Sequence, residues 1–552
     1  MELMFKLLPS TEKCFWDEKI ENKFEKTSFS MLKNERLDFQ LAYAGKELGY
    51  HAKVLALEIE SDIKDFVSVS RIENVPVQLP AWQDADPSGF LRIEPGLYPD
   101  LLIPLEDQHK LIFSDRDLRS LMITIENTDG IPAGEHYVTL KAMEEDSCLV
   151  SVTAKINVID AFLPEAKLIH TEWFHCDCLA TYYDVPVFSE RHWEIIENYM
   201  REASYHGVNL ILTPVFTPPL DTAIGGERPT VQLTDVTVTE NGYEFGFDRL
   251  DRWVALAQRC GMKYFEISHL FTQWGCKYAP KVIATVCGEE KRIFGWDTDA
   301  LSDEYRVFVR AFLTAFVAHA KELGIADKCF YHISDEPHID HLESYKKAKE
   351  MIYDIVGEYP MIDALSNYEF YESGAVKLPI PANSFIAPFI ENNVTPLWTY
   401  YCCGQYHKVS NRFLSMPGAR TRILGTQLFK YDIEGFLQWG FNFYNCQNSN
   451  YPINPYADTC AEYFVPAGDA YIVYPGPKGK PYRSLHGMQF LSALTDLRAF
   501  NLLSSLIGKE KTMAIIEDGI EPITFESYPS EQNYVNDLRE RINLAIAEAI
   551  KA

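Results

Sequence analysis

The chain has 552 residues, of which 47% are hydrophobic, so it is long enough for several domains and is not globally disordered. It contains 51 Lys and Arg against 79 Asp and Glu, which gives a net charge of −28. Such an acidic chain is repelled by phosphate backbones and by anionic lipid surfaces. Nucleic acids and membranes are therefore not expected as partners.

The N-terminal stretch MELMFKLLPSTEKCFWDEK lacks a basic start, an apolar run and a small-residue cleavage site, so we expect no signal peptide. No run of about 18 or more apolar residues occurs, so we expect no membrane span. The 12 cysteines are scattered and follow no disulfide framework. This pattern is typical of the reducing cytoplasm, which is the location we expect.

Residues 1–160 have the character of a β-sandwich that supports the rest of the chain. Short alternating or β-branched runs are separated by Pro and Gly, which is typical of that architecture. These runs are residues 37–45, 53–61, 121–128, 136–143 and 148–159. Within them, residues 123–140 predict a strand, a turn and a returning strand. No titratable cluster occurs here, so we interpret the region as a supporting domain, with carbohydrate binding as the alternative.

Residues 161–552 alternate strand-like runs with amphipathic helices, which predicts a (β/α)8 barrel. The predicted strands lie in residues 167–175, 208–214, 263–269, 328–334, 360–366, 383–389, 396–403 and 435–445. The clearest predicted helices are residues 189–207, 247–261, 302–324, 341–357 and 484–508. Active sites of this fold lie at the carboxyl ends of the strands, so the residues that finish the strands are considered together.

The fourth predicted strand ends in His332-Ile333-Ser334-Asp335-Glu336-Pro337, which places two carboxylates side by side at a barrel loop. Neighbours in a regular strand point to opposite faces, so both can reach one cleft only where the strand geometry breaks down. Pro337 favours an extended conformation for Glu336. The pair could simply cap the next helix. Its position at the end of a barrel strand favours a catalytic role.

Adjacent carboxylates restrict the mechanism of a glycosidase. Usual retaining and inverting enzymes hold two carboxyl groups on opposite sides of the scissile bond. Two consecutive residues more naturally serve one face of the substrate, as in hydrolysis assisted by a 2-acetamido group. In that scheme one carboxylic acid protonates the leaving oxygen, and the other carboxylate holds the acetamido N–H.

Aromatic and polar residues at the other strand ends are candidates for sugar binding. Flat apolar rings can stack on sugar rings, although any single aromatic residue is more often part of a core. A long loop after the second strand adds polar candidates at its tip. The candidate substrate-binding residues are Trp173, His175, Asp221, Arg228, Trp274, Trp398, Tyr400 and Trp439.

Metal, thiol and nucleotide chemistry are not expected. The run His175-Cys176-Asp177-Cys178 matches no zinc spacing and has no second cluster. Cys402 and Cys403 have no evident base to activate a thiol. No phosphate-binding glycine motif occurs. We therefore expect no cofactor and no metal.

Several segments together resemble glycoside hydrolase family 123 and its relatives with a DUF4091 C-terminal region. They are HISDEP at 332–337, WTYYCC at 398–403, the stretch 418–445 and GDAYIVYPGP at 468–477. The resemblance spans residues 167–503 and fits a β-sandwich followed by a barrel. It implies a β-N-acetylgalactosaminidase in which Asp335 orients the acetamido group and Glu336 is the acid/base. The partner would be a glycan or glycoconjugate with a terminal β-linked N-acetylgalactosamine.

Two other functions remain open. The chain could be a glycosidase for a different sugar with a direct carboxylate nucleophile, for which Asp363 or Asp221 could supply the second carboxyl. It could also be a non-catalytic protein that binds glycans through the same barrel.

Overall fold

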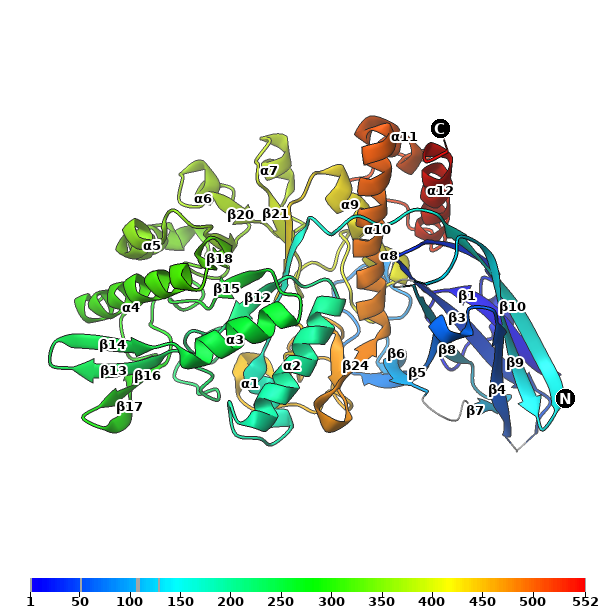
Figure 1. Ribbon diagram of the computed structural model, residues 1–552, viewed down its shortest axis with the longest axis horizontal. Helices are drawn as coiled ribbons and strands as arrows, with labels where there is room; N and C mark the ends of the chain where they lie inside the picture. The colour runs from blue at the N-terminus through cyan, green and yellow to red at the C-terminus, as the bar shows by residue number, and fades with distance from the viewer. Residues whose placement is uncertain (1, 50–51, 106–109, 128–129, 552) are drawn as a thin grey trace.

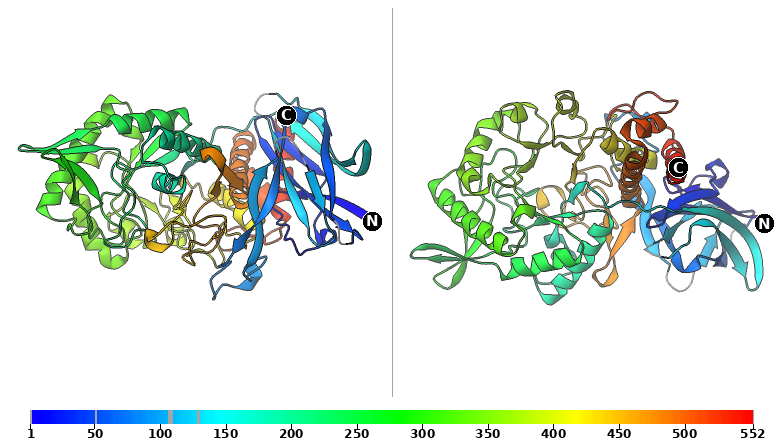
Figure 2. Two further views of the ribbon diagram at one scale, coloured as in Figure 1. Left: turned by 90° about the horizontal axis from the view of Figure 1, so that it is seen from below. Right: turned by 45° about the horizontal axis from the view of Figure 1, so that its top comes forward.

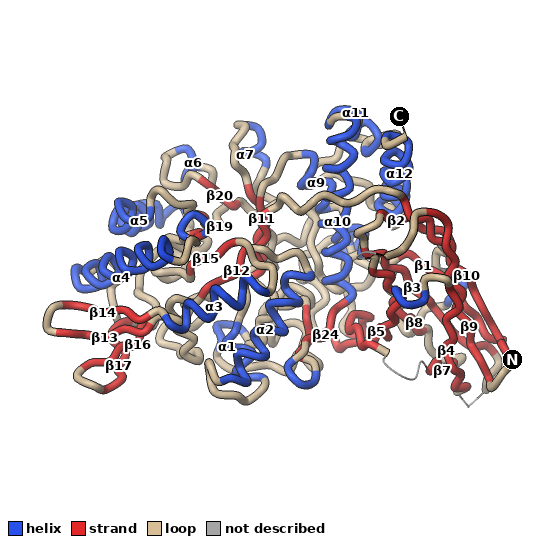
Figure 3. The backbone as a smooth tube through the Cα atoms, in the orientation of Figure 1, coloured by secondary structure: helices blue, strands red, loops and turns tan. Residues whose placement is uncertain are grey.

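We describe a computed structural model of the chain over residues 2–49, 52–105, 110–127 and 130–551. The molecule is elongated (Figure 1): long strands from the first 160 residues lie at one end, and a larger part that mixes helices with short strands lies at the other. Figure 3 shows how much of the second part is loop around its short strands. The protein is thus a mixed α/β molecule with several sheets.

Two β-sheets share one core at the N-terminal end. Among the described residues, the larger sheet has the order β1 (Glu2–Pro9), β3 (Arg36–Lys46), β8 (Arg119–Glu126), β5 (Val67–Val77), β6 (Gly96–Pro104), β24 (Pro481–Ser484), β23 (Val473–Pro475). The smaller has the order β2 (Ser28–Leu32), β10 (Ser147–Ile159), β9 (Gly134–Glu144), β4 (Lys53–Ser61), β7 (Lys110–Phe113). Buried and exposed residues alternate along β4 and β9, so each strand turns one apolar face toward the other sheet.

Five of these strands were predicted, but the predicted hairpin is wrong. Strands β3, β4, β8, β9 and β10 coincide with the alternating runs to within a few residues. β8 pairs with β3 and β5, whereas β9 pairs with β10 and β4. The chain therefore crosses from one sheet to the other between β8 and β9, because the apolar face of each strand is buried between the two sheets. Residues 128 and 129 of this crossing lie outside the described residues.

The larger sheet is completed by residues far along the chain. β24 pairs antiparallel with β6 through Arg483 and Ser484, and β23 pairs with β24. The N-terminal sheets are therefore not confined to residues 1–160, and this pairing ties the two parts of the molecule together.

The second part contains short parallel strands, each followed by one or more helices. Those in the described ranges are β11 (Ile169–Glu172), β12 (Leu210–Thr213), β15 (Tyr264–Ile267), β18 (Cys329–Phe330), β19 (Ile362–Ala364), β20 (Leu378–Ile380), β21 (Trp398–Tyr400) and β22 (Gly435–Gln438). Three sheets contain them: β11-β22-β21, β12-β15-β18 and β19-β20. Parallel bridges join Tyr331 to Met361 and Ala382 to Tyr400, and the Asn209 N–H donates to the His170 carbonyl. These contacts link the three sheets in cyclic order.

Most helices lie around the outside of these strands (Figure 2, right), whereas the C-terminal helix lies beside β2 of the N-terminal sheets. They are α1 (Cys176–Tyr182), α2 (Glu190–Tyr205), α3 (Asp248–Arg259), α4 (Asp303–Glu322), α5 (Leu342–Val356), α6 (Glu369–Glu372), α7 (Ala387–Glu391), α8 (Gly418–Arg422), α9 (Leu424–Lys430), α10 (Leu485–Ile507), α11 (Lys509–Ile516) and α12 (Tyr534–Ala549). The five clearest predicted helices are confirmed as α2, α3, α4, α5 and α10. Ser189 and Ser302 cap α2 and α4 by accepting backbone N–H bonds, which fixes where these helices begin.

Insertions after β12 and β15 form a separate small sheet. Its order is β14 (Gly242–Gly246), β13 (Asp235–Thr239), β16 (Val282–Val286), β17 (Glu289–Phe294). In Figure 1 it projects from the end of the molecule opposite the N-terminal sheets.

The sixth strand of the second part was predicted one segment too late. Residues 383–389 were expected to form it, but β20 is Leu378–Ile380, and the later residues turn into helix α7. Pro388 lies in the first turn of α7, where its missing N–H costs no hydrogen bond. An apolar run alone does not separate a strand from the first turn of a buried helix.

Helix α10 is long and apolar enough to cross a membrane by length and composition, with a mean hydropathy of 1.2 over its best window. In this fold it runs between the two parts of the molecule (Figure 1). Phe490 and Phe500 pack into the core of the second part, and Leu485 and Met488 pack against β5, β6 and β8. Its apolar surface therefore has a place in the protein interior.

Candidate active site

The Asp335-Glu336 pair lies where the chain leaves β18, and a break in backbone geometry brings both carboxylates to one pocket. Glu336 has a φ of 42°, the left-handed region that non-glycine residues seldom occupy. The expected extended conformation of Glu336 is therefore wrong. Its N–H donates to the Ala364 carbonyl at 2.9 Å, and the Trp274 N–H donates to the Asp335 carbonyl at 3.1 Å. Backbone hydrogen bonds to two neighbouring loops hold this unfavourable turn in place.

The two carboxyl groups have different surroundings. Asp335 is 6% exposed, and its Oδ2 lies 3.5 Å from Gln273 Nε2. Glu336 is exposed to the pocket, and its Oε1 accepts a 2.7 Å hydrogen bond from the Tyr400 hydroxyl. The orientation of Glu336 is thus fixed by β21, while Asp335 sits deeper in the wall.

Burial raises the pKa of Asp335 well above its usual value, and the nearby charges of Glu336 and Asp221 raise it further, against an opposing effect of His332. Although its side chain is open to the pocket, partial desolvation by the surrounding walls also raises the pKa of Glu336, and the Tyr400 hydrogen bond opposes this. Asp221 has a pKa of about 6, raised by burial, lowered in part by Arg228 and raised again by Glu336. Three neighbouring carboxyl groups with raised pKa values favour a retained proton, as a general acid requires.

The pocket around the pair has a volume of about 170 Å³. This is below the range of roughly 300–1,000 Å³ for drug-sized ligands, so it suits a single small ring. Its walls are mostly aromatic and apolar, with carboxyl groups on one side. The lining residues are Trp173, Asp221, Gln273, Trp274, Asp335, Glu336, Ala364, Tyr400, Cys402, Cys403, Leu437, Trp439, Phe464 and Val465.

Two of the indole rings in the wall are held by buried carboxylates. Trp439 Nε1 donates to Asp469 Oδ2 at 2.8 Å, and Trp173 Nε1 donates to Glu266 Oε1 at 2.8 Å. Trp274 is 53% exposed and lies at the mouth of the pocket. Fixed aromatic faces around a small cavity with carboxyl groups can hold a sugar ring from several sides.

Arg228 and His175, predicted to bind substrate, do not line this pocket. Arg228 donates to both oxygens of Asp177 at 2.8 Å, and its Nη1 donates to the Leu220 carbonyl at 3.0 Å. His175 lies between Arg228 and the Trp439 carbonyl, at 3.2 and 2.9 Å. A buried guanidinium requires a carboxylate partner, and Asp177 supplies it behind the wall. The two residues support the segment that carries Asp221.

Trp398 is also outside the pocket. It shares the inward face of β21 with Tyr400 but lies two residues earlier, one layer deeper among the strands. It is 2% exposed, packs on Phe330 at 5.7 Å between ring centroids, and occupies the space that a side chain at Gly435 would fill. Two residues on the same face of one strand can therefore differ in role, because their depth along the strand separates a core residue from a pocket residue.

The cysteines near the site have other partners. Cys402 and Cys403 line the pocket, but an interaction with Cys403 and burial raise the pKa of Cys402 well above the usual value, which disfavours a thiolate. Cys178 Sγ accepts from the Tyr444 N–H at 3.4 Å. None of these geometries resembles a nucleophile beside a base.

Sequence reasoning missed Gln273, Asp469, Phe464 and Val465. Gln273 stands directly before Trp274, and Asp469 lies within the segment GDAYIVYPGP, so both were near quoted motifs. Phe464 and Val465 come from a loop after β22 that has no distinguishing pattern. Only the fold brings that loop to the pocket.

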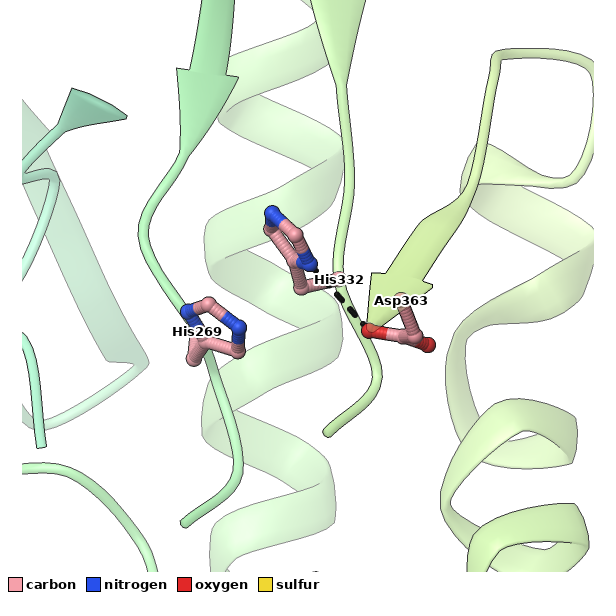
Figure 4. A group of neighbouring side chains, drawn as sticks. All are labelled: His269, His332 and Asp363. Carbon is pink, nitrogen blue, oxygen red and sulfur yellow. Dashed lines mark hydrogen bonds and ion pairs between the residues drawn. The ribbon is translucent and has the colours of Figure 1, made fainter. Parts of the chain in front are cut away.

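Under the pocket lies a buried polar group made of His269, His332 and Asp363 (Figure 4). One ligand-type atom from each lies within 4.8 Å of the others. The two imidazole rings are stacked, with centroids 4.0 Å apart and planes 21° apart, so their in-plane lone pairs do not converge on one point. Both nitrogens of His332 already face carboxylates. This arrangement does not fit a metal ion.

Asp363, one possible nucleophile, is turned away from the pocket. It is 1% exposed and accepts hydrogen bonds from the Ile333 and Ser334 N–H groups and from the Tyr345 hydroxyl. Asp221 does line the pocket, with a φ of 46°. In the described part of the chain, no side-chain hydrogen bond holds its carboxylate.

Paired carboxyl groups and fixed aromatic rings, around a small pocket at the carboxyl ends of parallel strands, are typical of a carbohydrate-cleaving hydrolase. The comparisons agree with this class. The model of the glycoside hydrolase family 123 catalytic domain matches residues 173–503, and the chain belongs to this family.

A solved structure of a family 123 enzyme shows the same fold. A family 123 glycoside hydrolase from Clostridium perfringens, studied for glycolipid glycan hydrolysis, matches with a TM-score of 0.75 and 14% identity, over 100% of this chain and 99% of that one. A family 5 xyloglucanase from Bacteroides ovatus matches with a TM-score of 0.29 and 8% identity, over 85% and 98% of the two chains. A family 39 enzyme from Bacteroides cellulosilyticus matches with a TM-score of 0.32 and 8% identity, over 86% and 82%. No curated protein matches this chain.

Proposed function

We propose that the protein is a retaining exo-glycosidase that removes β-linked N-acetylgalactosamine by substrate-assisted hydrolysis. The observation that carries this proposal is the turn at Glu336, which directs two consecutive carboxyl groups into one small aromatic pocket. Two such groups act on one face of a sugar, so the attacking atom on the other face is supplied by the substrate.

In the first step the 2-acetamido oxygen attacks the anomeric carbon, and the bond from that carbon to the leaving oxygen breaks. Glu336 donates its proton to the leaving oxygen. Asp335 accepts the acetamido N–H and stabilises the positive charge of the oxazolinium ring. In the second step water attacks the same carbon, the ring C–O bond breaks, and Glu336 takes the proton from the water. The sugar leaves with its original anomeric configuration.

The surroundings of Glu336 support its role as the acid. Its raised pKa lets it keep its proton to a higher pH than an ordinary glutamic acid does. The Tyr400 hydroxyl donates to Oε1, which leaves Oε2 for the transferable proton. Asp335 lies deeper, away from bulk water, where its negative charge can stabilise the positive charge that develops on the substrate.

We infer a β-sandwich followed by a (β/α)8 barrel as the architecture that carries this site. The shared core of the two N-terminal sheets and the cyclic order of the parallel strands support it. The substrate would be a glycan with a terminal β-linked N-acetylgalactosamine, and glycolipid glycans enter as candidates through the Clostridium perfringens relative. We keep the cytoplasm as the proposed location, which agrees with twelve free thiols.

A direct carboxylate nucleophile is the second candidate, because Asp221 lines the pocket and its carboxylate is unpartnered among the described residues. In that case Asp221 would attack the anomeric carbon and Glu336 would protonate the leaving group. A 2-fluoro sugar would then trap a glycosyl ester on Asp221, which peptide mass spectrometry would locate.

A panel of aryl β-glycosides tests the proposal. Turnover of the N-acetylgalactosaminide, with none of the 2-hydroxy galactoside, is expected. A thiazoline derived from N-acetylgalactosamine should inhibit competitively, because it imitates the cyclic intermediate. Successive fluorination of the acetyl group should slow turnover steeply, since fluorine weakens the attacking oxygen. Equal rates for both glycosides would contradict substrate assistance, and binding without any turnover would favour the non-catalytic alternative.

A further inference from the structure

A chain of buried hydrogen bonds lies directly under the catalytic pair. His332 Nε2 is 2.7 Å from Glu266 Oε1, and His332 Nδ1 is 3.1 Å from Asp363 Oδ1. All three residues are at most 2% exposed. The steps described above use none of them, although His332 lies only three residues before Asp335.

One end of this chain holds the backbone of the catalytic turn. Asp363 accepts from the N–H groups of Ile333 and Ser334, at 3.1 and 3.2 Å. The next residue, Ala364, accepts the Glu336 N–H through its carbonyl. The end of β19 therefore forms hydrogen bonds with the backbone on both sides of Asp335.

The other end holds a wall of the pocket. Glu266 Oε1 accepts from Trp173 Nε1 as well as from His332, and Thr171 donates to the second oxygen of Glu266. Trp173 forms part of the pocket wall. His332 thus connects Glu266, which orients the Trp173 ring, with Asp363, which holds the backbone of the catalytic turn.

We propose that His332 is a positioning residue that stays an imidazolium ion between Glu266 and Asp363, and that this fixed cation stabilises the ionised form of Asp335 during catalysis. Two buried carboxylates on opposite sides of one imidazole are stable together only if a positive charge lies between them. With both ring nitrogens as donors, His332 satisfies both acceptors at once.

The charged groups around the cluster agree with this assignment. Glu266 on β15 and Asp363 on β19 raise the pKa of His332 to about 10, although its burial opposes this. His269, stacked on His332, has a pKa well below the usual value because of burial and the neighbouring charge, so it is neutral. Asp335 faces the negative groups Glu336, Asp221 and Asp363, and His332 is the cation that acts against them.

The charge of His332 can be measured without any substrate. In ¹H–¹⁵N spectra of the histidine side chains, the signals lost in His332→Gln identify His332. We expect them to keep imidazolium shifts from pH 6 to about pH 9. Signals of a neutral ring at pH 7 would overturn the proposal, whatever the enzyme hydrolyses.

The catalytic consequence rests on the proposed function and is tested by pH profiles of kcat. His332→Gln should move the acidic limb up by about one pH unit, because removing a nearby opposite charge raises a carboxyl pKa by about 1–3 units. His269→Gln, which removes a neutral ring from the same stack, should leave that limb in place. Equal shifts in both variants, or none in either, would reduce His332 to a packing role.

A further variant keeps the test informative if His332→Gln folds poorly. Asp363→Asn preserves shape but removes one of the two anions that hold the imidazolium. It should lower the pH at which the His332 signals titrate, while the Glu266→Gln variant should do the same from the other side. Unchanged titration in both variants would contradict the proposal.

Discussion

The two parts of this molecule fill their interiors in different ways. Between the N-terminal sheets the buried side chains are almost all apolar, among them Leu41, Leu121, Ile123, Leu140 and Ile156. Among the parallel strands, charged and polar groups are buried just as deeply, including Glu172, Glu266, His332, Asp363, Arg412 and Asp469. Only the second kind of interior adjoins the pocket.

The charged interior among the parallel strands is the part of the fold that is less favourable for stability. Burying an ionised group costs several kcal/mol unless hydrogen bonds and an opposite charge compensate for it. Several charged residues in the second interior have such compensation, as in the contact of Arg412 with Glu172 at 2.9 Å. Apolar side chains would serve packing alone more simply, so the charges indicate chemistry. The predictions below test this separation.

The largest effect is expected for Glu336→Gln. Loss of the general acid should lower turnover by about 10²–10⁴-fold. The loss should be smaller for aryl glycosides whose leaving group needs no proton. Steady-state rates with good and poor leaving groups provide the measurement, and a small, equal loss on both would remove Glu336 from the role of acid.

Asp335→Asn should keep the shape of the site but lose the negative charge that stabilises the oxazolinium cation. Removing one electrostatic partner of a transition state typically costs about 10²–10³ in rate. The expected signature is a lower kcat on N-acetylgalactosaminides without a lower melting temperature, because the amide removes the cost of ionising a buried carboxyl with a raised pKa. A wild-type rate for this variant would show that Asp335 does not assist the acetamido group.

Trp398→Ala and Trp439→Ala separate core from pocket. Trp398 lies among the strands, so its truncation should cost about 3–5 kcal/mol of stability. Trp439 borders the cavity, so its truncation should mainly raise KM. Denaturant unfolding together with kinetics distinguishes them, and a reversed pattern would mean that the pocket wall is assigned wrongly.

Leu121→Ala tests the apolar interior. Leu121 is fully buried between the N-terminal sheets, so the change should cost about 2–5 kcal/mol. The loss should be the same at every pH, and kcat per folded molecule should not change. A changed pH profile would show that the N-terminal core influences the site.

Asp221→Asn should give the smallest effect and a pH-dependent one. The folded-state pKa of about 6 exceeds the unfolded value of about 3.9, so the folded wild type binds more protons and loses stability as pH rises from about 4 to above 6. The amide carries no such penalty. The variant should therefore be more stable by about 1–3 kcal/mol at pH 7 and should gain little at pH 4. A constant difference across this range would contradict the raised pKa.

Much of this site could be predicted because chemistry is concentrated at strand ends. The positions of Trp173, Tyr400, Trp439 and the Asp335-Glu336 pair at strand ends followed from the strand pattern. The turn at Glu336 could not be read from the sequence, since Pro337 favours the opposite conformation and only long-range hydrogen bonds overcome it. Periodicity gives the face of the strand on which Trp398 and Tyr400 lie. It does not give how far each residue is from the pocket, which is what distinguishes the two. The partners of Arg228 and His332 depend on contacts between distant segments.

The pairing of β24 with β6 has a consequence for how the chain is made. β6 ends at Pro104 and β24 begins at Pro481, a separation of 481 − 104 = 377 positions. At a synthesis rate of ~5–20 residues per second, the ribosome needs roughly 20–75 s to deliver the missing strand. During that interval the nascent chain carries an open sheet edge, a template for unwanted association with other chains. A cell that produces this enzyme in quantity must either protect that edge or keep newly made chains apart until residue 484 has emerged.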